Sequence, residues 1–251
     1  MTLSALILAG RRPGPDALIG DSGVATKALL PIAGRAMLVH VARALRAAPS
    51  VGAITILAQD SAALARDPAL AEVAAMADVT FVDSRDGISR SLAAFMSQHD
   101  APLLVTTADN VLLTPAIVED FVRGAAGADV AAGMVERQTL FARHPQSRRT
   151  WLKFRGGWWS GANLFHFGGV AVLPLLDFWS GIEQDRKKGL KIIAAFGPVL
   201  LIAVLLRLLT VHQGVARAGR RFGLTARVVP LDQAEACIDA DKPDDIALIE
   251  A

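Results

Sequence analysis

The 251-residue sequence lacks the short motifs that mark the common nucleotide-binding enzymes. It contains neither G-x-G-x-x-G nor G-x-x-x-x-G-K-[ST], so the Rossmann fingerprint and the P-loop are both missing. The absence of the glycine fingerprint argues against a dinucleotide-dependent dehydrogenase. The only cysteine is Cys237, which excludes an internal disulfide framework and a cysteine metal cluster. We therefore expect a protein of the reducing cytoplasm.

The chain also has a small net charge and shows no pattern of a signal peptide at its first residues. The formal charge is only +2, so the chain has no strong global field for nucleic acid. The opening residues lack a basic stretch, and we expect no signal peptide. No spacing typical of ligands or of a catalytic group connects the five histidines, which are His40, His99, His144, His166 and His212.

Hydrophobic residues, by contrast, are in excess. They make up 53% of the chain, and the mean hydropathy is +0.40, which is high for a soluble protein. We expect some apolar surface to meet a partner chain, as in a homodimer, or to make peripheral contact with a membrane.

Short apolar runs alternate with amphipathic segments along the chain. The runs predict strands at residues 5–9, 53–58, 79–82, 102–107, 129–135, 167–173 and 225–229, and the segments predict helices at 38–47, 62–76 with a break near Pro68, 88–99, 116–125 and 175–184. This alternation predicts an α/β fold, a three-layer, doubly wound, mainly parallel sheet, with residues 1–251 as one domain.

Ligands of such sheets bind beyond the carboxyl ends of the strands, where Gly10, Gly87 and Asp109 fall. The loop after the first strand contains Gly10, Arg11, Arg12 and Gly14, and Lys27 follows. Its backbone N–H groups and basic side chains could receive an anion, or the segment could be an ordinary strand-turn-helix with surface charges. Asp109 could hold Mg²⁺ or cap a turn.

Residues 137–160 form a candidate insertion in which basic residues crowd around tryptophans. Such interleaving can indicate nucleic acid, but one short run in a nearly neutral chain is weak support. We favour a phosphate-bearing small molecule, bound in part through Lys153 and Arg155, and expect no nucleic-acid partner.

Residues 182–223 form a predicted helical apolar segment. Ile192 to Val211 is almost unbroken hydrophobe, and its length alone would permit a membrane span. Gly197-Pro198 and Arg207 oppose a span. We predict two short helices buried in a lid, a dimer interface or a membrane surface, and a capping box at Thr210–Gln213.

Three separated motifs resemble one enzyme family. They are Leu8-Ala9-Gly10-Arg11-Arg12-Pro13-Gly14, Lys27-Ala28-Leu29-Leu30-Pro31-Ile32-Ala33-Gly34, and Asp239-Ala240-Asp241-Lys242-Pro243-Asp244-Asp245-Ile246. In this order they resemble the MobA-like NTP transferases and cytidylyltransferases, with Arg12 at the usual second glycine. The resemblance spans nearly the whole chain and implies the nucleotide-diphospho-sugar transferase-like fold with an acceptor-side insertion.

The resemblance also implies a reaction and a set of residues. A nucleoside monophosphate would pass from an NTP, with CTP or GTP favoured, to a phosphate- or phosphonate-bearing acceptor, with release of pyrophosphate. The implied residues are Lys27 and Arg12 for catalysis; Asp109 and Asp241 for Mg²⁺; Leu8, Ala9, Gly10, Arg11, Gly14, Gly87, Ser89 and Ser91 for the nucleotide; and Lys153, Arg155 and Asn163 for the acceptor. A glycosyltransferase using a nucleotide-sugar and a catalytically degenerate nucleotide-binding module remain alternatives.

Overall fold

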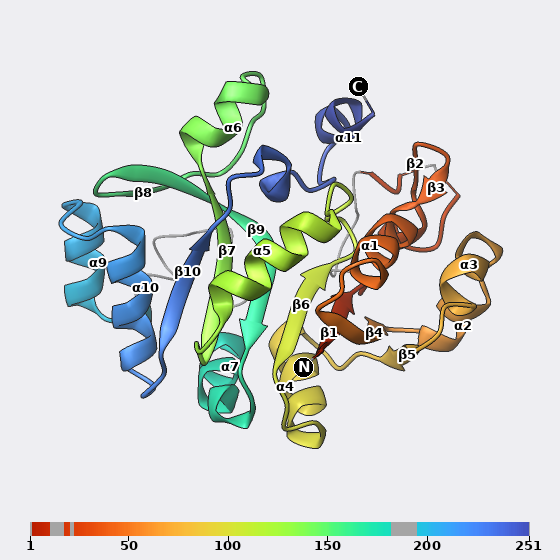
Figure 1. The fold of residues 1–251 in the computed structure, drawn as a ribbon, viewed down its shortest axis with the longest axis horizontal. Coiled ribbons are helices and arrows are strands. Elements are labelled where there is room, and N and C mark those ends of the chain that lie inside the picture. Colours follow the sequence, from red (N-terminus) through yellow and green to blue (C-terminus); the bar gives the residue numbers. More distant parts are fainter. Residues whose placement is uncertain (1, 11–17, 21–22, 182–194, 251) are drawn as a thin grey trace.

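An eight-stranded sheet forms the centre of the molecule in the computed structural model, which describes residues 2–10, 18–20, 23–181 and 195–250 (Figure 1). Strand β1 (Leu3–Leu8) pairs in parallel with β4 (Val51–Ala58) and with β6 (Leu103–Thr107). The strand order is β10-β7-β9-β6-β1-β4-β5, and β8 pairs with β9. The remaining strands are β5 (Val79–Asp83), β7 (Val130–Glu136), β8 (Leu152–Phe154), β9 (Gly157–Phe167) and β10 (Ala226–Pro230).

Strand β9 runs antiparallel to both of its neighbours, β6 and β7, whereas β10, β7, β6, β1, β4 and β5 are parallel where they pair with one another. A separate two-stranded hairpin consists of β2 (Pro31–Ile32) and β3 (Arg35–Ala36). The prediction of a mainly parallel sheet is confirmed.

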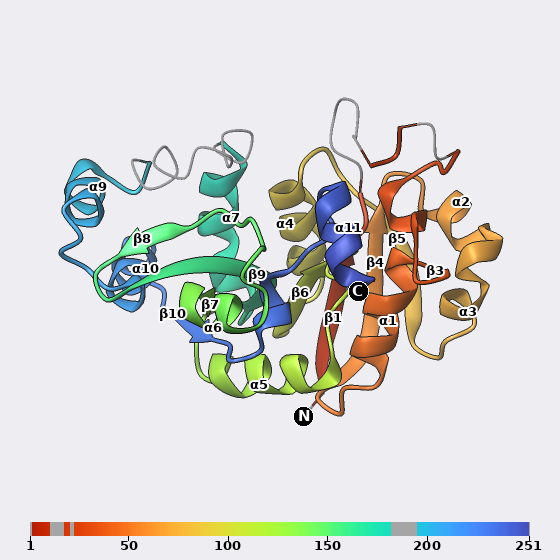
Figure 2. The same cartoon turned by 90° about the horizontal axis from the view of Figure 1, so that it is seen from above.

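Helices cover both faces of the sheet (Figure 2). Alternate residues of β1 show why: Ala5 and Ile7 belong to the core under α1 (Met37–Arg46) and α5 (Pro115–Ala125), whereas Leu6 belongs to the core under α4 (Ile88–Gln98) and α7 (Leu173–Ser180). Both faces of the parallel strands are therefore buried. The three-layer arrangement is as predicted.

The ends of several helices follow from local sequence. Thr114 Oγ1 accepts from the Ile117 N–H at 3.2 Å and caps α5, and Thr210 and Gln213 form the predicted capping box. The remaining α-helices described are α2 (Ser61–Arg66), α3 (Ala71–Ala74), α6 (Arg137–Arg143), α9 (Pro198–Leu205), α10 (Val211–Arg220) and α11 (Pro243–Ile249).

The strand predicted at residues 167–173 is wrong. Strand β9 ends at Phe167, and a short 3₁₀ turn at Val170–Val172 leads directly into α7. Gly168 and Gly169 break the apolar run, and Gly169 has a φ of 146°, which a side chain would not tolerate. Pro174 lies in the first turn of α7, where its missing N–H costs nothing.

The structure describes the predicted apolar segment, residues 182–223, only from residue 195 onward, because residues 182–194 lie outside the described residues. Gly197 precedes α9 with a φ of 116°, and Pro198 is the first residue of that helix. Within the described ranges, every helix is too short or too polar to cross a membrane.

Candidate active site

Three segments far apart in the sequence meet beyond the carboxyl ends of β1 and β6. Lys27 opens a 3₁₀ turn, Asp109 follows β6, and Asp241 precedes α11. A small apolar cluster joins these segments and consists of Leu30, Ile32, Met37, Val111 and Ala240, with Ile246 and Ile249 of α11 packed against it. The Ala240 N–H also donates to the Asp109 carbonyl at 3.0 Å. Apolar packing and one backbone bond therefore hold the charged residues together.

The Lys27 ammonium links two carboxylates. Its Nζ lies 2.8 Å from Asp109 Oδ2 and 2.6 Å from Asp241 Oδ1. Burial alone would lower the pKa of Lys27, but Asp109 and Asp241 outweigh burial and raise this pKa above its usual value. Lys27 is therefore a permanent cation between two carboxylates at neutral pH.

A third carboxylate, that of Asp239, completes a cluster in which one oxygen each from Asp109, Asp239 and Asp241 lies within 4.8 Å of the others. Burial and then the neighbouring carboxylates Asp109 and Asp241 raise the pKa of Asp239, against the lowering effect of Arg149. Carboxylate oxygens are the ligands that Mg²⁺ prefers. Three negative charges in so small a space fit a divalent cation, because added positive charge relieves their repulsion.

Arg149 holds the far side of this cluster. Its guanidinium pairs with the Asp239 carboxylate, donates to the Asp239 carbonyl at 3.0 Å and reaches Asp245 Oδ1 at 3.0 Å. The side chains of Arg149 and Asp245 are each only 9% exposed. Sequence reasoning missed Arg149, since it has no local motif. The only signal in the sequence was that Arg149 belongs to the basic segment 137–160, while Asp239 and Asp245 belong to an acidic segment that could pair with it.

Asn163 reaches the same cluster from β9. Its Nδ2 donates to Asp239 Oδ2 at 3.0 Å. Asn163 has a φ of 50°, and the pairing of β9 with β7 shifts register between Ala132 and Met134, opposite this residue. Asparagine tolerates this left-handed conformation better than most residues, and the irregularity turns its side chain towards Asp239. Asn163 thus lies beside the carboxylate cluster, and its role in acceptor binding stays a prediction.

Two residues close to Asp109 in the sequence, Thr107 and Asn110, stabilise the end of β6. Thr107 Oγ1 donates to Asp109 Oδ1 at 2.5 Å. Asn110 is buried, and its Nδ2 donates to the Ala162 carbonyl at 3.1 Å. Asn110 therefore ties the end of β6 to β9, while the Asp109 side chain points to Lys27.

The loop between β5 and α4 contains the predicted base-binding residues. Gly87 immediately precedes α4 and has a φ of 87°. Ser91 Oγ accepts from the Arg85 N–H at 2.9 Å and donates to the Gly87 carbonyl at 2.7 Å. Ser89 and Ser91 are both buried. The Ser91 hydroxyl thus stabilises the loop by hydrogen bonds to the backbone of Arg85 and Gly87. Nucleotide binding by Gly87, Ser89 and Ser91 stays a prediction.

The loop after β1 is described only at its start. The Ala9 N–H donates to the Leu57 carbonyl at 2.9 Å, and Gly10 is exposed beside the Gln59 side chain. Leu8 ends β1. The predicted residues Arg11, Arg12 and Gly14 lie outside the described residues, so their roles stay predictions.

Lys153 and Arg155 are not brought to the carboxylates. They belong to the β8–β9 hairpin, where Lys153 pairs with Trp158 and its Nζ lies 4.3 Å from that ring. Trp158 precedes Asn163 by five residues on β9, a separation of about 16 Å at roughly 3.3 Å per residue. Arg155 instead donates to Gln213 Oε1 of α10 at 3.2 Å.

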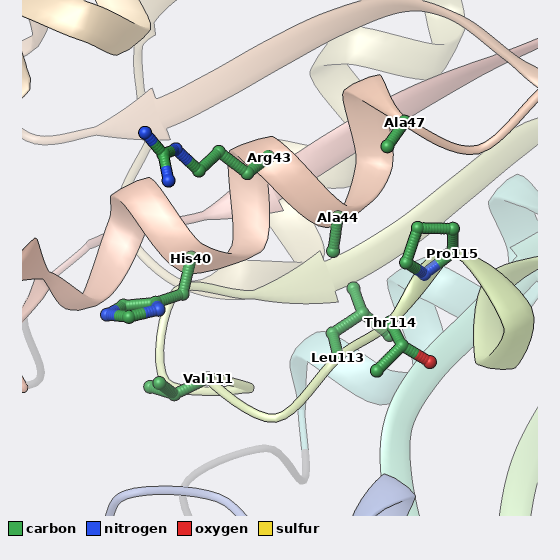
Figure 3. A pocket seen from close by; sticks show the side chains of 8 residues that line it. All are labelled: His40, Arg43, Ala44, Ala47, Val111, Leu113, Thr114 and Pro115. Carbon is green, nitrogen blue, oxygen red and sulfur yellow. The ribbon is translucent and has the colours of Figure 1, made fainter. Parts of the chain in front are cut away.

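A hollow of about 280 Å³ lies between α1 and the start of α5 but contains none of the clustered carboxylates (Figure 3). His40 Nε2 lies 2.9 Å from the Ile32 carbonyl, and Arg43 pairs with Glu72. The two most polar groups lining this hollow are thus engaged elsewhere, and we place the candidate site at Lys27 and the carboxylates.

Comparison with known proteins gives a consistent result. A family model described as the MobA-like NTP transferase domain matches residues 5–180. A comparison with curated proteins gave no match. Among solved structures, a hypothetical transferase from Thermus thermophilus is 28% identical with a TM-score of 0.81, and the alignment covers 98% of this chain and 100% of that chain.

Two more distant structures share the fold. A 4-diphosphocytidyl-2C-methyl-D-erythritol synthase from Anaerococcus prevotii has a TM-score of 0.58 at 10% identity, over 99% of this chain and 94% of that chain. A CMP:2-keto-3-deoxy-manno-octonic acid synthetase in complex with CTP has a TM-score of 0.58 at 14% identity, over 99% and 97% of the two chains. The predicted nucleotide-diphospho-sugar transferase-like fold is therefore confirmed.

Proposed function

The chain belongs to the MobA-like NTP transferase domain family, and we propose on this premise that it is a nucleotidyltransferase. It moves a nucleoside monophosphate from an NTP to a small molecule that carries a phosphate or phosphonate group. Pyrophosphate is the second product. The observation that supports this reaction best is the contact of one lysine, Lys27, with two carboxylates from distant segments, Asp109 and Asp241, at the ligand-binding end of the sheet.

The chemistry requires positioning and charge neutralisation more than covalent help. An acceptor oxygen attacks the α-phosphorus of the NTP in line, and the bond from the α-phosphorus to the bridging oxygen of pyrophosphate breaks. An acceptor phosphate is already ionised near neutral pH, so the reaction needs no general base. This agrees with a described carboxylate cluster that has no histidine in it.

Lys27 is the residue that would stabilise the negative charge that develops on the phosphates during transfer. Its raised pKa keeps the amine protonated at neutral pH. The phosphate oxygens of a nucleotide would compete with Asp109 and Asp241 for its three N–H donors, and the bonds gained would be strongest as charge builds on the leaving pyrophosphate. Arg12, in the loop after β1, is assigned the same role on the phosphates.

Asp109 and Asp241 are the proposed Mg²⁺ ligands, with Asp239 beside them. When bound, Mg²⁺ would supply charge neutralisation and orientation of the phosphate oxygens. Arg149 and Asn163 each hold Asp239 by a hydrogen bond. Both residues therefore orient Asp239. Because the Asn163 amide is already bonded to Asp239, we assign Asn163 a place at the edge of the acceptor site.

The favoured nucleotides are CTP and GTP, with Gly87, Ser89 and Ser91 beside the base. Molybdopterin, sugar phosphates, polyol phosphates and lipid-precursor phosphates are the acceptor classes to screen. We place a polyol- or headgroup-like acceptor with CTP first, because the chain also carries an apolar segment at residues 182–223.

The test begins with thermal unfolding in the presence of CTP, GTP, UTP or ATP, each with and without Mg²⁺. A ligand that binds only the folded state raises the melting temperature by mass action. We expect one NTP to raise it in the presence of Mg²⁺, and Asp109→Asn to abolish the increase. Pyrophosphate release from that NTP should then identify the acceptor, and Lys27→Met should abolish turnover.

The matched control is Asp232→Asn, an exposed carboxylate outside the cluster, which should keep both the thermal shift and turnover. A thermal shift with nucleotide-sugars but with no NTP would replace the proposal with a glycosyltransferase. No response to either class would favour a degenerate module whose apolar helices are the functional part.

A further inference from the structure

An exposed apolar surface lies at the edge of the molecule formed by α9 and α10, at the opposite edge of the sheet from β5 (Figure 1). Helix α9 contains only apolar residues, Pro198 to Leu205. Its inner side packs, because Ala203 and Val204 are buried and Val204 joins a core cluster with Phe154, Val211 and Val228. The outer side does not pack: the side chains there are between 53% and 77% exposed and comprise Val199, Ile202, Leu205, Leu206 and Leu208.

So many large apolar side chains gathered on one short segment are unusual for an exposed surface. Elsewhere in the described residues, the exposed large hydrophobics are only Val82 and Phe165, at 41% and 37%. A concentrated apolar patch marks a place where a partner or a membrane covers the protein. The charges around the patch decide between these occupants.

The sequence around the patch has one sign of charge. Residues 186–231 contain nine lysines and arginines and no aspartate or glutamate, in a chain that has 26 basic and 24 acidic residues overall. The described members of this set are Arg207, Arg217, Arg220, Arg221 and Arg227, of which Arg227 donates to the Gly124 and Ala126 carbonyls at the end of α5 and so does not face the patch. A second copy of the chain that docked on this surface about a two-fold axis would bring like charges together. An anionic lipid surface, which offers hydrocarbon beneath negative headgroups, complements both the apolar patch and the charges.

A pocket adjoins the patch and has the chemistry of an anion site. It encloses about 580 Å³, and its lining includes three arginines, Arg137, Arg155 and Arg207, together with Trp158 and Glu136. Arg137 is held in place by stacking, since its Cζ lies 4.8 Å from the Trp158 ring. The Arg155 N–H donates to the Leu209 carbonyl at 2.9 Å, which fixes the hairpin tip to the end of the apolar patch. Pocket and patch are therefore one continuous surface.

Arg207 lies where the two features meet and adopts a backbone conformation that suits glycine. Its φ is 53°, and the Leu208 N–H donates to the Ala203 carbonyl at 2.8 Å, which closes the end of α9. A non-glycine residue in the left-handed region costs about 1 kcal/mol. An arginine there puts a positive charge between two exposed leucines, Leu206 and Leu208, at a cost to the fold.

From these observations we propose that α9, the turn through Leu208 and the arginine pocket form a docking surface for an anionic lipid bilayer. The apolar side chains enter the headgroup boundary while the arginines contact lipid phosphates. The helix lies on the membrane and does not cross it, since its eight residues span about 12 Å against a hydrocarbon core of roughly 30 Å. The surface is separate from the candidate active site, so this proposal does not depend on the proposed reaction.

The experiment is co-sedimentation of the full-length chain with two kinds of vesicle. One contains phosphatidylcholine alone, and the other contains phosphatidylcholine and phosphatidylglycerol in equal amounts. We expect binding to the anionic vesicles, weaker binding as ionic strength rises, and little binding to phosphatidylcholine. Ile202→Gln with Leu205→Gln should lower the partition coefficient at least about tenfold.

Arg207→Gly separates binding from folding. Glycine adopts the left-handed conformation without strain, so the melting temperature should stay the same or rise. The loss of one positive charge near the lipid should lower anionic-vesicle binding about fivefold. The matched controls are Val82→Gln, an exposed apolar residue on β5, and Arg66→Gln, an exposed arginine on α2, and both should bind like the unmodified protein.

Three results would overturn the proposal. The first is no binding to anionic vesicles, or binding that the α9 variants do not change. The second is equal binding to both kinds of vesicle, which would remove the role of the arginines. The third is a dimer in analytical ultracentrifugation that Ile202→Gln with Leu205→Gln disperses while lipid binding is absent, which would show that a second copy covers the patch.

Discussion

Replacement of Arg149 by methionine is the sharpest test of how the carboxylate cluster is held. Methionine keeps most of the apolar length of the side chain and removes the guanidinium. The change leaves Asp239 and Asp245 without their shared cation. Asp245 is 9% exposed and Asp239 is 21% exposed, so water can compensate only in part.

The magnitude follows from this burial. Removal of one partner from a buried charge pair costs about 3–5 kcal/mol, because the remaining charge stays in a poorly solvated place. Asp239 keeps the hydrogen bond from Asn163 Nδ2 at 3.0 Å. We therefore expect Arg149→Met to lower the free energy of unfolding by about 3 kcal/mol near neutral pH.

The loss should depend on pH with a known sign. The pKa of Asp239 is raised in the folded protein mainly by burial, even though Arg149 lowers it. Without Arg149 the folded-state pKa rises further above the unfolded value of 3.8, so the folded state holds more protons than the unfolded state. The difference in stability between the variant and the unmodified protein should therefore shrink as the pH falls towards that unfolded value, and grow as the pH rises.

Urea unfolding at several pH values measures both effects, provided that the slope with denaturant is unchanged. Arg43→Met is the control, since the Arg43–Glu72 pair is exposed and its loss should be far smaller. Adding Asp239→Asn and Asp245→Asn to Arg149→Met should recover most of the stability. A loss that persists in the triple variant, or that does not change with pH, would mean that packing rather than charge explains the role of Arg149.

Two further predictions concern the fold. Gly219→Ala would place a Cβ against Ala226 Cβ and 2.8 Å from the Leu224 carbonyl oxygen. We expect this variant to lower the free energy of unfolding, measured in urea, by about 1–3 kcal/mol. The control is Gly161→Ala, whose Cβ would have no atom within 4 Å and which should be tolerated. Burial lowers the pKa of His166 below its usual 6.5, against the raising effect of a hydrogen bond to the Ala128 backbone, so the unfolded state takes up the proton first and stability should fall as the pH drops below about 6.5. His166→Gln should flatten that decline, by up to about 1.4 kcal/mol per pH unit, and an unchanged decline would contradict the assignment.

The sequence predicted most of the sheet because a buried parallel strand leaves a short, continuous apolar run. The run at 102–107 became β6, and Asp109 falls just beyond it, as predicted. Strand β9 was missed for a physical reason. Buried and more exposed positions alternate from Ser160 to His166, but the residue types do not follow them: Ser160 and His166 are polar and buried, whereas Phe165 is apolar and exposed.

The site was predictable to the extent that it lies in local motifs. Lys27, Asp109 and Asp241 were predicted from such motifs, and the structure places the Lys27 ammonium in contact with both carboxylates. Arg149 was not found, since its partners Asp239 and Asp245 lie 90 and 96 residues further along the chain. A side chain defined only by distant partners leaves no pattern of its own in one sequence.

The hairpin of β8 and β9 shows how direction in a sheet decides distance from a site. Because β9 is antiparallel to β6, its first residues continue outward past the end of β6, and β7 accompanies them only as far as Glu136, which pairs with Trp159. Asn163 is close enough to this edge to reach Asp239, but Gly157 lies six residues earlier, about 20 Å further out. Lys153 and Arg155 are carried outward with it, and Arg155 meets α10 and Leu209 rather than the carboxylates. The charged tip therefore lies beside the apolar helix α9 and away from the carboxylates, so acceptor binding by Lys153 and Arg155 stays a prediction that requires an acceptor reaching about this distance.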